Sequence, residues 1–362
     1  MSDMLRRPLA RIPAISAVVC NFNGERYLEE CLRSVLAQGP DEVLVVDDGS
    51  SDGSVALVRE RFPTVQVLAL GENRGPCVAR NAGMRAAKHR WVLAVDNDAV
   101  LEPGALERLR AALEARPDCC VAQVRSVLYD EPSRVHYDSG WPHYLGLIAL
   151  RNFYTPLERA EGSGAIEVGA LIAITVLLDR DAVLGVGGYD EQLFYLAEDL
   201  DLGLRLRLAG ERLLVVEDAL VRHRGGTAGL SFRGGGYPER RVFLHARNRP
   251  WILGKCYRVR TLLLALPGLA LYEVVWTLFV LRQGQLGAHL AGRWAFLCGL
   301  GRVWRARAGV QAARRARDRD VLVGGPLVLS PSLLRSGAAR GFTRALDRCL
   351  SAWWTLVRPL CG

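Results

Sequence analysis

The sequence predicts an α/β fold in which a mostly parallel sheet carries helices on both faces. Within roughly the first 115 residues, four short apolar runs alternate with four segments of helical periodicity. The run Trp91–Val95 is almost wholly apolar, as a strand buried on both faces should be. It is followed at once by Asp96-Asn97-Asp98. This order places two carboxylates at the carboxyl edge of the sheet, where open α/β folds bind ligands.

Strands and helices are expected in alternation along this part of the chain. The predicted strands are Ile15–Cys20, Val43–Val46, Val65–Leu70 and Trp91–Val95, and the predicted helices are Tyr27–Leu36, Val55–Arg61, a segment opened by Pro76, and Pro103–Ala115. Asn21, Asp47 and Asp96 each follow one of these strands directly. A scaffold has no need of such residues at one edge of three strands, whereas a site for a nucleotide and a cation does. The dinucleotide fingerprint Gly-x-Gly-x-x-Gly is absent from the first turn, so a hydride-transfer cofactor loses its best support.

The pattern is less regular between residues 117 and 168, and we expect longer loops and short strands there. The segments predicted after it are an apolar run at 168–178, a helix at 198–208 and a strand at 212–216. The helix opens on Glu198 and Asp199. These two acids can simply suit the helix dipole, a role that any acid fills.

Asp96 and Asp98 have two interpretations. Two carboxylates placed so close together repel each other unless a cation lies between them, and hard divalent cations prefer oxygen ligands. Alternatively, the motif is a turn in which Asp98 caps the next helix. His223 is equally open, because a lone histidine is more often structural than a metal ligand. The surrounding motifs favour the metal-binding interpretation for both the acidic pair and His223.

Six motifs, taken in order, resemble those of inverting family 2 glycosyltransferases of the GT-A fold. They are CNFNGERYLEECLRSVLAQ, VLVVDDGSSDGS, NRGPCVARNAG, WVLAVDND, GGYDEQLFYLAEDLDLGLRLRLAG and VRHRGG. Within that family the chain looks nearest to bacterial rhamnosyltransferase-like and galactofuranosyltransferase-like enzymes. The resemblance covers about residues 12 to 255 but not the segment from 125 to 165, so it leaves the donor sugar and the acceptor open.

The resemblance implies four residues of the pocket for the sugar-nucleotide donor. Asn21 and Asp47 would line the nucleotide pocket, with Asp47 hydrogen-bonding the pyrimidine. Arg80 would lie near the donor and help to hold the acidic motif. Asp96 would face the ribose.

The resemblance also implies a metal centre and a catalytic pair. Asp98 and His223 would bind a divalent cation, Mg²⁺ or Mn²⁺, that bridges the donor diphosphate. Asp199 matches the general base, and Glu198 stands beside it in the same acidic pair. A cation that neutralises the departing diphosphate and a carboxylate that takes the acceptor proton together make a coherent inverting mechanism.

The implied activity is the transfer of a hexosyl or deoxyhexosyl group from a nucleotide-diphosphate sugar. The acceptor would be a hydroxyl of a lipid-linked or polysaccharide molecule in envelope glycan synthesis. An alternative is a catalytically silent nucleotide-sugar-binding subunit of an envelope assembly complex, against which the joint presence of Asp98, Asp199 and His223 argues. A processive synthase is a third class, but it needs several membrane spans and a Gln-x-x-Arg-Trp motif, and the sequence has neither.

The basic C-terminal part of the chain predicts contact with a membrane surface. The net charge is +9, and residues 258–320 hold eleven arginines against three acids, a surplus of eight. Such basicity beside apolar stretches suits anionic lipid headgroups. Nucleic acid is the other partner that a basic segment can bind, but no nucleic-acid-binding motif accompanies this one, so none is expected.

Thr261–Leu281 is long enough to cross a hydrocarbon core of about 30 Å and contains one charged residue, Glu273. Six cations precede it within twenty residues and two follow it, which would keep the catalytic part cytoplasmic. A spanning helix would export the arginines of 302–319, which the same rule disfavours. A re-entrant or interfacial helix bundle avoids this conflict. A buried core helix of a soluble protein is the other alternative.

The nine cysteines include no Cys-x-x-Cys pair, which indicates reduced thiols and a cytosolic compartment. The expected location is therefore the cytoplasmic face of the cell membrane. The chain is expected to divide into an N-terminal arm (1–12), a GT-A catalytic domain (13–250) and a basic, apolar, membrane-associated helical region (251–362).

Overall fold

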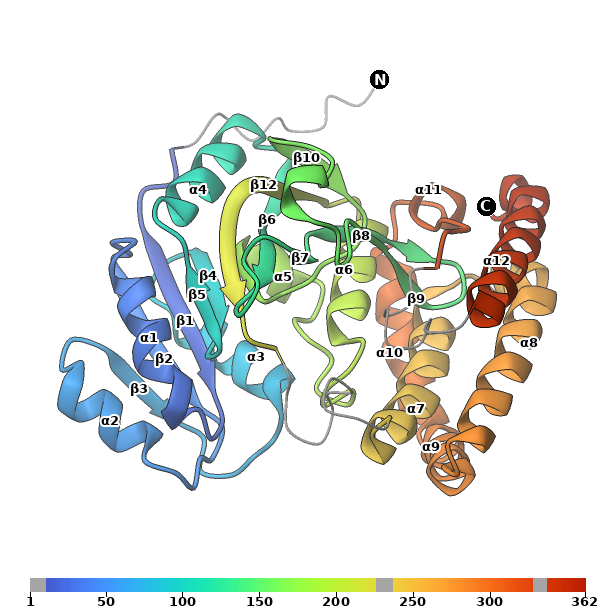
Figure 1. Cartoon of the computed structure of the whole chain (residues 1–362), viewed down its shortest axis with the longest axis horizontal. Coiled ribbons are helices and arrows are strands. Elements are labelled where there is room, and N and C mark those ends of the chain that lie inside the picture. The colour runs from blue at the N-terminus through green and yellow to red at the C-terminus, as the bar shows by residue number, and fades with distance from the viewer. Residues whose placement is uncertain (1–10, 226–236, 328–336) are drawn as a thin grey trace. The chain divides into compact units, whose positions relative to one another are not determined.

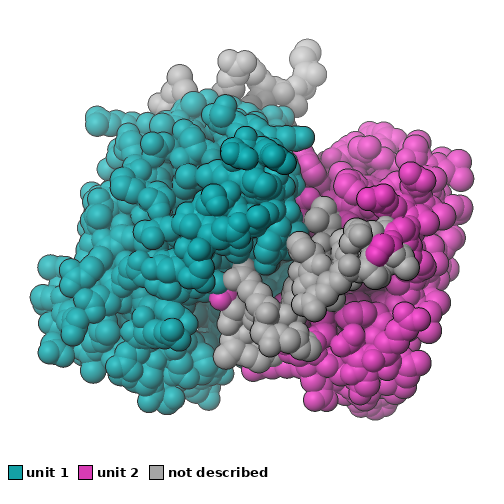
Figure 2. Space-filling model, viewed as in Figure 1, with its two compact units in different colours: residues 1–139, 151–202, 211–224 teal, residues 140–150, 203–210, 225–362 magenta. Residues whose placement is uncertain are grey.

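The computed structural model describes residues 11–225, 237–327 and 337–362, so most of the expected N-terminal arm lies outside the described residues. The described chain forms two compact units, which Figure 2 shows in teal and magenta. Unit 1 takes its described residues from 1–139, 151–202 and 211–224, and unit 2 takes its own from 140–150, 203–210 and 225–362.

Unit 1 is built on a ten-stranded sheet with the order β10-β12-β6-β11-β4-β1-β2-β3, in which β5 also pairs with β12 and β7 with β6 (Figure 1). Its strands are β1 Ile15–Asn21, β2 Glu42–Asp47, β3 Gln66–Ala69, β4 Trp91–Asp96, β5 Ala99–Leu101, β6 Cys119–Leu128, β7 Val135–Tyr137, β10 Ala165–Val168, β11 Thr175–Asp179 and β12 Arg212–His223. Its helices are α1 Glu25–Leu36, α2 Ser54–Arg61, α3 Pro76–Ala86, α4 Ala105–Ala115, the 3₁₀ turn η1 Leu157–Arg159, α5 Arg180–Gly185 and the first part of α6 Glu198–Leu208.

The half of the sheet formed first along the chain is parallel. β1 pairs in parallel with both β2 and β4, and β2 pairs in parallel with β3. The other half is mixed, because β11 runs antiparallel to β4 and β6 whereas β12 runs parallel to β6. The predicted α/β class with flanking helices is therefore confirmed, with a mixed sheet.

Alternating side chains of the central strands pack against helices on opposite faces. Ala17 and Val19 of β1 share one buried apolar cluster with α1, α2 and α4. Val18, which points the other way, lies against α3, where a Cβ on Gly83 would come within 2.3 Å of its side chain. This close packing of α3 on the sheet fixes the helix that carries Arg80.

One stretch differs from the prediction. β6 is a ten-residue strand inside the sheet, where loops and short strands were expected. Gln123 and Arg125 interrupt the apolar run of β6, so the sequence did not predict a buried strand here. In the structure the Gln123 amide donates to Ala170 O at 2.9 Å and accepts from Ile172 N at 2.7 Å. The Arg125 guanidinium ion-pairs with two buried carboxylates. Polar groups buried with partners are compatible with a central strand.

Unit 2 consists mainly of helices. Its elements are most of β8 Ser139–His143 and β9 Leu147–Arg151, which form a two-stranded sheet, the end of α6, and α7 Glu239–Cys256, α8 Val259–Arg282, α9 Leu286–Cys298, α10 Leu300–Ala313, α11 Asp318–Val321, α12 Gly337–Val357 and the 3₁₀ turn η3 Arg358–Leu360. Of the helices in the described part of the chain, α8 is the one that is long and apolar enough to cross a membrane, judged by length and composition.

The single acid of α8 is neutralised within unit 2. Glu273 Oε2 lies 2.9 Å from Arg249 Nη1, and its other oxygen contacts Arg293. Seven large apolar side chains of the helix are exposed: Val259, Leu263, Leu266, Leu271, Val274, Leu278 and Leu281. Their spacings of three to five residues keep them on one side of the helix. α8 thus combines a neutralised charge with an apolar surface along its whole length.

Candidate active site

The polar residues predicted at the strand ends lie at one edge of the sheet. In the parallel register Asn21 pairs with Asp47, and Cys20, one residue earlier, pairs with Asp96. The Asn21 amide donates to Asp47 Oδ1 at 2.9 Å and accepts from the Asn97 amide at 2.8 Å. Three strand ends are therefore joined by side-chain hydrogen bonds into one surface.

Asp47 closes the loop that follows β2. It is buried, and its two oxygens accept from Ser50 Oγ at 2.5 Å and Ser50 N at 3.0 Å. Gly24 lies so close to this network that an added Cβ would be 2.1 Å from the Asn97 amide nitrogen and 2.2 Å from Asn21 Oδ1. A residue larger than glycine at position 24 would displace both amides.

Three of the predicted site residues come together as a group that could hold a metal ion. One ligand atom from each of Asp96, Asp98 and His223 lies within 4.8 Å of the other two, and His223 Nε2 is 3.3 Å from Asp98 Oδ1. Strand pairing produces this arrangement, because β5 begins right after Asp98 and its Ala99 is the partner of His223 on β12. Arg224 N also donates to Asp98 O at 3.2 Å.

The sequence-based boundary of β12 at Val216 fell short of this site. The strand continues through an irregularity between Val216 and Leu220 and runs on to His223. That irregularity hid the continuation, because the polar residues at 217 and 218 interrupt the apolar pattern. The continuation is what delivers His223 to the edge where Asp98 lies.

The electrostatics of this group suit a cation. Burial and the neighbouring Asp98 charge raise the pKa of Asp96, against the opposing effects of Arg80 and His223. Two carboxylate oxygens and an imidazole nitrogen form a donor set that Mg²⁺ or Mn²⁺ accepts. A divalent ion would relieve the repulsion between the charges of Asp96 and Asp98, which adds to the effect of burial on the pKa of Asp96.

Arg80 stands between this group and a second pair of acids. Its Nη2 lies 2.7 Å from Asp96 Oδ1, and its Nη1 lies 3.5 Å from Glu198 Oε1 and 3.6 Å from Asp199 Oδ1. The guanidinium is buried and also lies over the ring of Tyr189, 5.2 Å from its centre. Burial lowers the pKa of Arg80, but Asp96 and the other nearby acids raise it well above the usual value, so it stays a cation.

Glu198 and Asp199 open α6 and share a crowded environment. Burial first, and the charge of Asp199 second, raise the pKa of Glu198 to about 7. Burial also raises the pKa of Asp199, whereas Arg80 and the amide of Ala173 lower it. Asp199 Oδ2 accepts from Ala173 N at 3.0 Å, while Oδ1 makes no hydrogen bond within the described part of the chain. The side chain of Asp199 is 22% exposed and that of Glu198 is 8% exposed, so Asp199 is the more accessible acid.

The segment just before this pair has unusual backbone geometry. Phe194, Leu196 and Ala197 have φ of 62°, 72° and 69°, values that residues with a side chain rarely adopt. Such conformations persist where the surrounding structure enforces them, and they cluster at functional sites. The sequence gives no sign of them, because none of the three residues is glycine.

Two further residues of the site escaped sequence analysis. Asp48 accepts from Arg74 N at 2.9 Å and Gly75 N at 2.8 Å, and so holds the turn in front of α3. Its position directly after Asp47 could have identified it. His136, whose ring contacts His223, lies in the segment without periodicity, where no sequence signal marks it.

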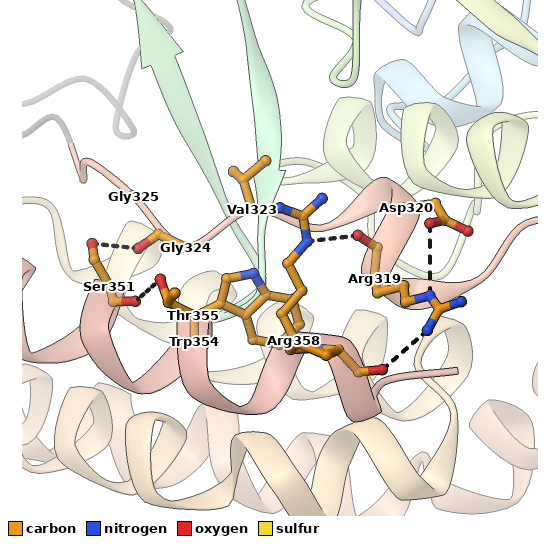
Figure 3. A pocket seen from close by; sticks show the side chains of 10 residues that line it. Arg319, Asp320, Val323, Gly324, Gly325, Ser351, Trp354, Thr355 and Arg358 are labelled. Atoms are coloured by element: carbon orange, nitrogen blue, oxygen red, sulfur yellow. Dashed lines mark hydrogen bonds and ion pairs between the residues drawn. The ribbon is translucent and has the colours of Figure 1, made fainter.

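A cavity of about 580 Å³ lies in unit 2, between the segment 319–325 and the C-terminal end of α12 (Figure 3). Arg319 and Arg358 line it together with Trp354, and the Arg358 guanidinium donates to Arg319 O at 2.8 Å. Asp320 is the one acid of this lining. None of the predicted site residues contributes to this cavity.

The chain is similar to known proteins in both sequence and structure. Residues 16–172 match the family model Glycosyl transferase family 2. The chain is 30% identical over 227 residues to a glucosyl-dolichyl phosphate glucuronosyltransferase of Haloferax volcanii, over 58% of this chain and 69% of that protein. It is 29% identical over 266 residues to an N-acetylglucosaminyl-diphospho-decaprenol L-rhamnosyltransferase of Mycobacterium tuberculosis, over 66% of this chain and 86% of that one.

A shorter match has higher identity. The chain is 40% identical over 117 residues to the succinoglycan biosynthesis protein ExoO of Rhizobium meliloti, which is 32% of either chain. Among solved structures, GalNAc-T7 with UDP, GalNAc and Mn²⁺ is similar with a TM-score of 0.50 and 18% identity, over 66% of this chain and 51% of that one, a likeness of fold. These matches and the mixed sheet agree with the GT-A fold and the resemblance described above, and the chain belongs to glycosyl transferase family 2.

Proposed function

We propose that this chain is a metal-dependent inverting glycosyltransferase that moves a hexosyl or deoxyhexosyl group from a nucleotide-diphosphate sugar to a hydroxyl. The observation that carries the proposal is the link made by Arg80 between the group of Asp96 and Asp98 and the pair of Glu198 and Asp199. The proposed donor residues and the proposed base all belong to unit 1, and Arg80 links them.

In this proposal Asn21, Asp47, Arg80 and Asp96 bind the donor nucleotide. Asp98 and His223 hold Mg²⁺ or Mn²⁺, with Asp96 beside them. The bound ion would supply the positive charge that the departing diphosphate needs. The donor set supports this assignment, as does the crystallisation of GalNAc-T7 with UDP and Mn²⁺.

Asp199 takes the proton of the acceptor hydroxyl as that oxygen attacks the anomeric carbon. Its Oδ1 makes no hydrogen bond within the described residues and lies 3.6 Å from Arg80 Nη1, so one oxygen of this carboxylate is not committed to a hydrogen bond in the fold. Glu198 supports the pair by raising the proton affinity of the site. Attack from the side opposite the diphosphate inverts the anomeric configuration without a covalent intermediate.

The acceptor is proposed to be lipid-linked or a polysaccharide in envelope glycan synthesis. The names of two relatives support a lipid-linked acceptor, since one refers to a decaprenol diphosphate and the other to a dolichyl phosphate. The name of ExoO, a succinoglycan biosynthesis protein, supports the broader glycan class.

We further propose that residues 13–250 form the catalytic domain, after an arm at 1–12, and that 251–362 rests on the cytoplasmic face of the cell membrane. The exposed apolar side of α8 supports an interfacial position. Trp294 of α9 and Trp304 of α10 are also strongly exposed, and the basic surplus of this region suits anionic headgroups.

The test is a panel of nucleotide-diphosphate sugars incubated with the purified full chain and isolated membrane lipid as acceptor, with release of nucleoside diphosphate as readout. Release with one or a few donors, lost in excess chelator and in Asp98→Ala, is the expected result. A protein that binds a nucleotide sugar but never releases the diphosphate would instead be the silent subunit. Full turnover in excess chelator would contradict metal dependence.

A further inference from the structure

His136 contacts the proposed metal ligand His223. The contact is made at Nδ1 of His223, whereas Nε2 of His223 faces Asp98. The two Nδ1 atoms are 3.0 Å apart, whereas His223 Nε2 lies 3.3 Å from Asp98 Oδ1. The centres of the two imidazole rings are 5.0 Å apart, and their planes are inclined by 27°. His223 is therefore held between a carboxylate on one nitrogen and an imidazole on the other.

The fold fixes His136 in this place. β7 and β12 are the two neighbours of β6 at this point, because Ser126 pairs with Tyr137 on one side and with Val221 on the other. The ring of His136 is buried and packs against Tyr137 at 3.9 Å and, edge to face, against Tyr154 at 6.0 Å between ring centres. An imidazole packed in this way presents a pre-set nitrogen to His223.

The short distance between the nitrogens limits the possible protonation states. Only one hydrogen fits between two nitrogens 3.0 Å apart, so one Nδ1 donates and the other accepts. A metal bound at His223 Nε2 needs the lone pair of that nitrogen, which puts the ring hydrogen on Nδ1. His223 Nδ1–H is then the donor, and His136 Nδ1 is the acceptor.

We infer that His136 is a positioning residue of the metal centre, which accepts this hydrogen bond and so selects the metal-binding tautomer of His223. The inference rests on the proposed function, because it presupposes a metal ion at Asp98 and His223. In the competing tautomer His223 Nε2–H points at Asp98 Oδ1, and that hydrogen occupies the position a metal needs. Because His136 Nδ1 accepts the hydrogen of His223 Nδ1, it disfavours the Nε2–H tautomer. Hydrogen-bond partners of metal-bound histidines commonly act in this way.

His136 acts through His223 and does not itself belong to the ligand group. Within the described chain, the atoms that lie within 4.8 Å of one another come from Asp96, Asp98 and His223. Replacement of His136 should therefore weaken metal binding without abolishing it.

The test is calorimetric titration of the purified full chain with MnCl₂, without donor sugar or acceptor. His136→Phe keeps a ring but removes the acceptor, and we expect Mn²⁺ affinity to fall by about 10- to 100-fold, the usual effect of losing an outer partner. His136→Asn places an amide oxygen near the position of Nδ1, and we expect it to retain most of the affinity. His223→Ala reports on the metal centre itself and should remove binding.

The outcomes separate the two proposals. Unchanged binding in His223→Ala would overturn the metal centre of the proposed function. Loss in His223→Ala together with wild-type affinity in His136→Phe would leave the metal centre intact and overturn the role of His136. If His136→Asn lost as much affinity as His223→Ala, His136 would be a direct ligand, which also overturns the inference.

A second measurement needs no variant. Nitrogen NMR of ¹⁵N-histidine-labelled wild-type protein saturated with Mg²⁺ reads which ring nitrogen carries hydrogen. We expect His223 to be protonated at Nδ1 and His136 at Nε2. The opposite pair of tautomers would contradict the inference even if every variant failed to fold.

Discussion

Arg80 Nη2 lies 2.7 Å from Asp96 Oδ1, although the two residues come from different elements, the helix α3 and the end of strand β4. The other terminal nitrogen of Arg80 faces the acids at the start of α6. One buried cation therefore balances carboxylates that would otherwise repel each other, and it holds the proposed base on the same side as the proposed donor site. Under the proposed function, the stability and the chemistry of the site should both depend on Arg80.

Arg80→Met should strongly destabilise the protein. The change leaves Asp96, Glu198 and Asp199 without their buried partner, and breaking a buried pair in this way costs about 3–5 kcal/mol. The measurement is denaturant unfolding. Arg85→Met on the same helix is the control, because that side chain is 58% exposed and its pair with Glu191 is weak at 3.7 Å. Equal losses in the two variants would contradict the central place given to Arg80.

Turnover should fall as the pH is lowered, and the fall should begin at a pH where an ordinary aspartate is still ionised. The pKa of Glu198 is raised to about 7 and that of Asp199 is raised as well, so the pair takes up a proton at a pH where ordinary carboxylates stay ionised. A base that has been protonated cannot accept the acceptor proton, so the activity lies on the alkaline side. The measurement is kcat against pH at saturating donor and metal.

In Glu198→Gln, the fall in kcat on the acid side of the pH profile (the acid limb) should move to lower pH. The change removes the negative charge next to Asp199, and the remaining carboxylate then ionises more easily. A limb that stays in place in Glu198→Gln, or a wild-type profile that is flat from pH 5 to 8, would show that this pair does not control the reaction.

Ala197→Gly should stabilise the protein by about 1 kcal/mol, as judged by thermal or denaturant unfolding. Ala197 has a φ of 69°, and a left-handed conformation costs a residue with a Cβ roughly 1–2 kcal/mol more than it costs glycine. Glycine loses part of this gain through its greater freedom in the unfolded chain. Ala37→Gly, at a helix end with a φ of −65°, is the matched control and should destabilise. Destabilisation in both variants would mean that the turn before α6 is not strained.

Removal of apolar side chains from α8 should weaken membrane binding. Leu263 and Leu278 are 66% and 54% exposed, so the double change to Ser removes little internal packing. Sedimentation with vesicles that contain an anionic phospholipid should show less bound protein than for the wild type. Ile166→Ser, an exposed apolar residue of unit 1, should leave binding unchanged. Equal binding by all three proteins would contradict an interfacial role for α8.

Much of the first half of the fold follows from local sequence patterns. The strands β1, β2 and β4 stand out as apolar runs, and the polar residue that ends each one marks the edge where the site lies. Parallel pairing brings these ends together without any further signal. The central part of the site was accordingly accessible from the sequence.

The rest of the site depends on tertiary contacts that have no local signature. β6 contains Gln123 and Arg125, whose burial becomes favourable only through partners more than ten residues away. His136 reaches His223 only because β6 lies between their strands. The neutralisation of Glu273 likewise depends on helices before and after α8, so the sequence alone could not show how the charge is accommodated.

The central claim is that Asp199 is the base of a glycosyl-transfer reaction, and the turnover of Asp199→Asn tests it most directly. The amide keeps the size of the side chain but loses its basicity, so nucleotide-sugar affinity should stay near that of the wild type. Turnover should fall by about 10²- to 10⁴-fold, the usual contribution of a positioned base. Asp181→Asn, at an acid that is 61% exposed on α5, should stay close to the wild type. Near-normal turnover of Asp199→Asn, with Glu198→Gln inactive, would show that Glu198 and not Asp199 is the base. Normal turnover of both variants would contradict the glycosyl-transfer mechanism proposed for this site.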